Sequence, residues 1–83
     1  MSSTIQKVVD YHVRRLRDKN PEIRMKAIRE LELLAHPAAL DALRAVFEHD
    51  VDADVRKAAQ EAGRKIFLKN KNTGDLSGLA STE

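Results

Sequence analysis

The 83-residue sequence has no cysteine and no tryptophan, and it contains only three glycines, two prolines and three aromatic residues. Without cysteine, the chain can form neither a disulfide nor a thiolate metal site. No apolar run approaches the roughly 18 residues of a membrane-spanning helix. The first four residues, Met-Ser-Ser-Thr, do not resemble the charged start of a secretory signal. These absences predict a cytoplasmic location.

Charge is nearly balanced overall but unevenly distributed. The net charge is +2, from 15 Lys and Arg against 13 Asp and Glu. Residues 37–54 hold one basic and five acidic side chains, a sum of −4, whereas residues 55–71 hold six basic and one acidic, a sum of +5. Such asymmetry is typical of proteins that associate with themselves or approach a polyanion, and it does not bear on the fold.

Two segments about 32 residues apart are near-copies of each other. Each has an Asp, then a β-branched residue and an Arg five and six positions later, and an Ala four positions after the β-branched residue. The copies contain Asp18, Ile23, Arg24 and Ala27 in the first segment, and Asp50, Val55, Arg56 and Ala59 in the second. A repeat of this length predicts stacked helical hairpins.

Four segments show apolar residues at helical spacing and no β alternation. Pro21 and Pro37 restart the chain after the first and second segments, and a turn spans residues 50–54. Ser3 with Gln6 fits a capping box, Asn20 fits the N-cap before Pro21, and Asp52 or Asp54 caps the last helix. The stripes comprise Ile5, Val8, Val9, His12, Val13 and Leu16; Ile23, Ala27, Ile28, Leu31 and Leu34; Leu40, Leu43 and Phe47; and Val55, Ala58, Ala59, Ala62, Ile66 and Phe67.

The sequence therefore predicts an all-α fold of two helical hairpins stacked as a short α-solenoid. The folded domain is expected over residues 1–68, with repeats at about 4–35 and 37–68. Residues 69–83 are rich in Asn, Ser, Thr and Gly, and they contain too little apolar surface to offset the chain entropy. We expect these residues to form a disordered tail.

The pattern of Asp, β-branched residue, Arg and Ala in both copies, together with Pro21 in the first turn and Pro37 between the copies, resembles HEAT repeats over roughly residues 8–68. It is most similar to the short bacterial repeats of phycobilisome-lyase-like proteins. The resemblance implies that Asp18 and Asp50 are turn acids and that Arg24 and Arg56 form a ladder between adjacent repeats. The second copy is atypical, because its turn has one extra residue before Asp50 and lacks the Pro that the first turn has at Pro21. In addition, Gly63 stands where the first copy has Leu31.

No arrangement of residues indicates catalysis, a metal or a cofactor. Asp50, Asp52, Asp54 and Glu61 have the spacing of an EF-hand loop, but Val55 stands where that loop requires Gly. The three histidines are 24 and 13 residues apart, which is not a metal-ligand spacing. No Ser-His-Asp set or Gly-rich phosphate loop is present. We expect a non-catalytic protein without a cofactor.

Apolar residues off the stripes, among them Met25, Leu33 and Leu68, indicate a surface covered by another chain. Two repeats also fall short of the roughly three that bury a continuous core. The first hypothesis is an interaction module that binds a protein partner or itself through an exposed helix face. The residues assigned to that contact are Arg29, Leu33, Lys57, Arg64 and Lys65.

Two alternatives remain. The basic cluster of the last helix is typical of a nucleic-acid-binding helical domain, although no aromatic platform for base stacking accompanies it. The family resemblance alone suggests an accessory subunit of a tetrapyrrole enzyme.

Overall fold

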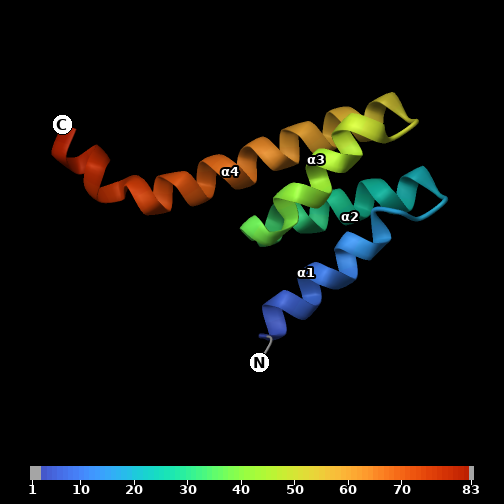
Figure 1. Cartoon of the computed structure of the whole chain (residues 1–83), viewed down its shortest axis with the longest axis horizontal. Helices are drawn as coiled ribbons and strands as arrows, with labels where there is room; N and C mark the ends of the chain where they lie inside the picture. The colour runs from blue at the N-terminus through green and yellow to red at the C-terminus, as the bar shows by residue number, and fades with distance from the viewer. Residues whose placement is uncertain (1–2, 83) are drawn as a thin grey trace.

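A computed structural model describes the backbone of residues 3–82 and the side chains of residues 3–71. The order of elements is α1 (Thr4–Arg15), α2 (Pro21–Leu34), the 3-10 turn η1 (Pro37–Ala39), α3 (Leu40–His49) and α4 (Ala53–Thr82). Figure 1 shows two antiparallel hairpins, α1–α2 and α3–α4, with α4 projecting beyond the other helices. Residues 3–82 contain no strand. The predicted all-α fold of two stacked hairpins is confirmed.

Side-chain caps set where three of the helices begin. The Ser3 hydroxyl accepts from Gln6 N at 3.1 Å, and Asn20 Oδ1 accepts from Glu22 N at 2.8 Å with Pro21 at the first helical position. Asp52 Oδ1 accepts the amide hydrogens of Asp54 and Val55 at the start of α4. These contacts satisfy amides that have no partner within the helix.

Two local expectations need correction. The Gln6 side chain does not reach back to complete a capping box, because its amide donates to Asp10 one turn later, at 3.1 Å. The third helix does not begin at Pro37. His36 Nδ1 accepts from Ala38 N, which holds residues 37–39 as a 3-10 turn before α3 starts at Leu40.

The last helix continues past residue 68, where the sequence predicted its end. Asn70 lies half-buried, and its side-chain amide donates to the carbonyl oxygens of Ala35 at 2.9 Å and Ile66 at 2.8 Å. The first of these bonds ties α4 to the end of α2, a contact between residues far apart in sequence. The side chains of residues 72–83, most of the predicted tail, lie outside the described part, and disorder there stays a prediction.

Ala35 ends α2 in the left-handed region, with φ of 52° and ψ of 33°. This conformation brings a Cβ close to the backbone in every residue except glycine, which is the usual choice at this position. The Ala35 carbonyl accepts the Asn70 amide, so this strained residue is also one of the points where α2 and α4 are joined.

Ala35→Gly should stabilise the protein by about 0.5–1 kcal/mol, because relief of the left-handed strain outweighs the added freedom of the unfolded chain. The measurement is the urea midpoint of unfolding followed by circular dichroism. Ala38→Gly, in the right-handed turn η1, serves as the control and should lower the midpoint. A midpoint for Ala35→Gly at or below that of the unmodified protein would contradict the expectation.

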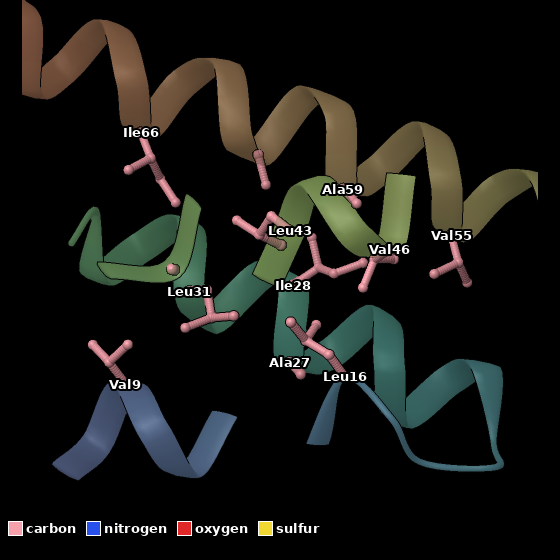
Figure 2. Close-up of a cluster of buried hydrophobic side chains, with 12 residues drawn as sticks. Val9, Leu16, Ala27, Ile28, Leu31, Leu43, Val46, Val55, Ala59 and Ile66 are labelled. Carbon is pink, nitrogen blue, oxygen red and sulfur yellow. The ribbon is translucent and has the colours of Figure 1, made fainter. Parts of the chain in front are cut away.

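The core lies between the two hairpins and takes side chains from all four helices (Figure 2). Its largest fully buried side chains are Ile28, Leu31, Leu43, Ile66, Val9 and Val55. Met25, expected away from the core, is partly buried and packs against it.

Phe47 and Phe67 were expected in the core but are 40% and 54% exposed. Their helices are amphipathic as predicted, but the side of the α3–α4 hairpin that carries these rings has no further hairpin over it within the described chain.

Candidate functional site

Arg24 is the buried charged residue that joins the two repeats. Its Nε and Nη2 donate to the two carboxylate oxygens of Asp50 at 2.8 and 3.0 Å, and its Nη1 donates to the carbonyls of Asp18 at 2.7 Å and Lys19 at 3.2 Å. The Arg24 and Asp50 side chains are only 10% and 7% exposed. A bidentate pair of this kind fixes the relative position of the groups that carry it. Arg24 therefore holds its own turn and the turn of the next hairpin together.

Arg56 occupies the same position in the second repeat, and its surroundings differ in one respect. Its Nη1 donates to the carbonyl of Asp50 at 2.7 Å, as Arg24 does to that of Asp18. Among the described residues, however, no carboxylate pairs with Arg56. The Asp18 carboxylate similarly accepts a hydrogen bond from the amide of Asn20 in its turn, at 2.8 Å. In the described part of the chain, no cation pairs with this carboxylate.

The acidic turn of residues 50–54 is occupied by structural contacts. The Asp50 carboxylate binds Arg24 and also accepts Asp52 N at 2.9 Å, while Asp52 caps α4. Glu61 lies on α4, in agreement with the helix predicted from Val55 onward. Within residues 3–71, no three His, Cys, Asp or Glu side chains come together in a way that could hold a metal ion.

A shallow groove runs between α2 and α4, on the face opposite the buried contacts of those helices. Glu32, Leu33, Lys65, Leu68 and Lys69 line it. Leu33 is 77% exposed and Leu68 41% exposed, and both are large apolar side chains. Lys65 Nζ lies 3.1 Å from Glu32 Oε2 across the groove. An exposed pair of this type adds about 0–1 kcal/mol to stability, so the main property of the groove is its exposed apolar surface between charges.

The structure brings together some, but not all, of the residues assigned to partner binding. Leu33 and Lys65 line the α2–α4 groove, and Arg64 borders a neighbouring depression with Lys65 and Leu68. Arg29 and Lys57 are exposed but line neither hollow.

Two features of the surface were not among the site residues predicted from the sequence. Leu68 belongs with Leu33, and its position off the apolar stripe of α4 was the available signal. The second feature is a groove between α3 and α4, lined by Leu40, Phe47, Gly63 and Phe67 among others. Periodicity placed Leu40, Phe47 and Phe67 in the core, and no local pattern indicated that they line an open surface.

The helices form antiparallel pairs that are stacked in sequence order, and an Arg–Asp contact joins successive turns. This arrangement defines a helical-repeat protein of the α-solenoid class. The family model of HEAT repeats matches residues 3–63, which is most of the chain. The chain belongs to the HEAT-repeat family. No curated protein and no solved structure shows significant similarity to it.

None of the described helices combines the length and the apolar character that crossing a bilayer requires.

Proposed function

We propose that this chain is a non-catalytic interaction module that binds a protein partner through the groove between α2 and α4. HEAT repeats are generally protein-interaction modules and generally lack catalytic activity. The observation that carries the proposal is the pair Leu33 and Leu68, which leaves large apolar side chains in solvent beside each other on two helices. Exposed apolar surface with a charged rim is typical of protein-binding sites.

The charges around the groove favour a protein over a nucleic acid. Lys65 is held by Glu32 at 3.1 Å, and Arg56 donates to the carbonyl of Asp50, so two members of the basic cluster on α4 contact oxygen atoms of the chain itself. Phosphate binding requires cations that are open to the backbone of the ligand. The resemblance to phycobilisome-lyase-like proteins remains a prediction about the kind of HEAT protein, and so does its suggested link to a tetrapyrrole enzyme.

Leu33→Ala tests the groove. A tagged chain is used to capture partners, and the affinity of a captured protein is then measured by titration. We expect Leu33→Ala to weaken binding at least about tenfold, as truncation of an apolar anchor does. Val51→Ala is the matched control, because Val51 is also a strongly exposed apolar residue but lies in the turn before α4. Equal binding by both variants would show that the partner does not use this groove.

A further inference from the structure

The two ends of the repeat stack carry complementary unused contacts. In this chain the turn acid of the second repeat, Asp50, binds the arginine of the first repeat, Arg24, at 2.8 and 3.0 Å. At one end of the stack Arg56 has the backbone contact of Arg24 but lacks a carboxylate partner among the described residues. At the other end Asp18 has the turn geometry of Asp50 but lacks a cation.

The apolar surface at the Arg56 end repeats the buried surface of the first hairpin. The spacing between corresponding residues is 32 for α2 and α4 and 31 for α1 and α3, because the second turn has the extra residue. Leu16, 4% exposed against the second hairpin, corresponds to Phe47, 40% exposed. Fully buried Leu31 corresponds to Gly63, and both Phe47 and Gly63 line the α3–α4 groove. The first hairpin has a surface that the second hairpin covers. The corresponding surface of the second hairpin is therefore left open.

The apolar surface at the Asp18 end repeats the covering surface of the second hairpin. Ala39 is fully buried and Ala42 packs against the core. Their counterparts one repeat earlier, on α1, are Val8 and Tyr11, and both are exposed. The surface that would cover a preceding hairpin is thus present on α1, with nothing described beneath it.

We propose that copies of this chain associate head to tail, with α1 and α2 of one copy covering the α3–α4 groove of the next. Asp18 of the covering copy binds Arg56, as Asp50 binds Arg24 within each chain. The proposal extends the proposed function by naming a second copy of this chain as a partner, and it uses a surface distinct from the α2–α4 groove.

A head-to-tail contact that does not close into a ring leaves one unused end of each kind on every assembly. The mean mass of the purified chain should therefore keep rising with concentration in sedimentation velocity, beyond that of a dimer. Asp18→Asn keeps a side-chain oxygen for the turn amide, and Arg56→Met removes the donors. Each should weaken association at least about 30-fold, as expected when one partner of a desolvated charge pair is removed.

Mixing the Asp18→Asn and Arg56→Met variants provides the decisive experiment. The Asp18→Asn chain keeps its Arg56 end and the Arg56→Met chain keeps its Asp18 end, so the mixture should form one-to-one dimers and nothing larger. Phe67→Ser, which removes an exposed ring from the groove, tests the same end without touching Arg56. Asp54→Asn is the control and should associate like the unmodified chain.

A monomer at every concentration overturns the inference, and so does association that Asp18→Asn, Arg56→Met and Phe67→Ser leave unchanged. A closed dimer that does not grow also overturns it. Loss of association in Leu33→Ala alone would assign self-association to the α2–α4 groove, against the head-to-tail arrangement. None of these results decides the proposed function, which depends on the effect of Leu33→Ala on a captured protein.

Discussion

Substitution of Asp50 by alanine should lower the free energy of unfolding by about 3–5 kcal/mol, the usual effect of removing one partner from a buried ion pair. The loss is large because Arg24 would keep its charge at a buried position while two of its donors lose their acceptors. Domains are stable by only about 5–15 kcal/mol, and small ones are usually at the lower end. Urea unfolding followed by circular dichroism should therefore show a variant that is close to unfolding without denaturant.

Two further variants separate the ion pair from general effects of charge. Asp54→Ala removes an acid from the same turn, but the Asp54 side chain is exposed and takes part in no described hydrogen bond or ion pair. It should cost less than about 1 kcal/mol. The double substitution Arg24→Met with Asp50→Ala should cost less than the sum of the single changes, because no buried charge is left unpaired. Additive losses would mean that the two residues contribute independently.

Leu31→Ala should destabilise the protein by about 2–5 kcal/mol, since it removes three buried carbons and leaves a cavity between the hairpins. Leu31 is fully buried, and Figure 2 shows it in the cluster with side chains of α1, α3 and α4. The thermal unfolding midpoint, measured at several concentrations, is a suitable readout.

Leu33→Ala is the matched control for this change. It is the same substitution two residues later on α2, at a side chain that is 77% exposed, and it should change stability by no more than about 0.5 kcal/mol. A comparable loss for both leucines would mean that residues 31 and 33 are equally buried in solution. That result would also remove the basis for the α2–α4 groove.

Much of the fold could be predicted from the sequence because local signals agree with one another. Asn20 followed by Pro21 marks the start of α2, and the apolar spacing of Ala27, Ile28 and Leu31 marks its buried face. Ends of elements were less predictable. Gln6 had Asp10 as a competing acceptor, and residues 37–39 formed a turn that helical spacing does not distinguish from a helix start.

The surfaces could be predicted only in part. Periodicity shows which side of a helix is apolar, but it does not show whether another layer covers that side, so Phe47 and Phe67 were placed in the core. Asn70 was assigned to a tail because the composition of residues 69–83 is polar. Its bond to the Ala35 carbonyl depends on a tertiary approach of α4 to the end of α2, which no local pattern in the sequence encodes.

The position of α1 has a consequence for how the molecule opens. Figure 1 shows α1 splayed from the other helices, and Val9 is its fully buried residue, with Val13 partly buried and Leu16 buried just after its end. By contrast, α2 is held by Arg24 on one side and by Asn70 at its end. Local unfolding starts where few apolar contacts must be broken. We therefore expect α1 to detach more easily than α2. Its detachment would expose the side of α2 that α1 covers, while α2 and α4 stay packed together.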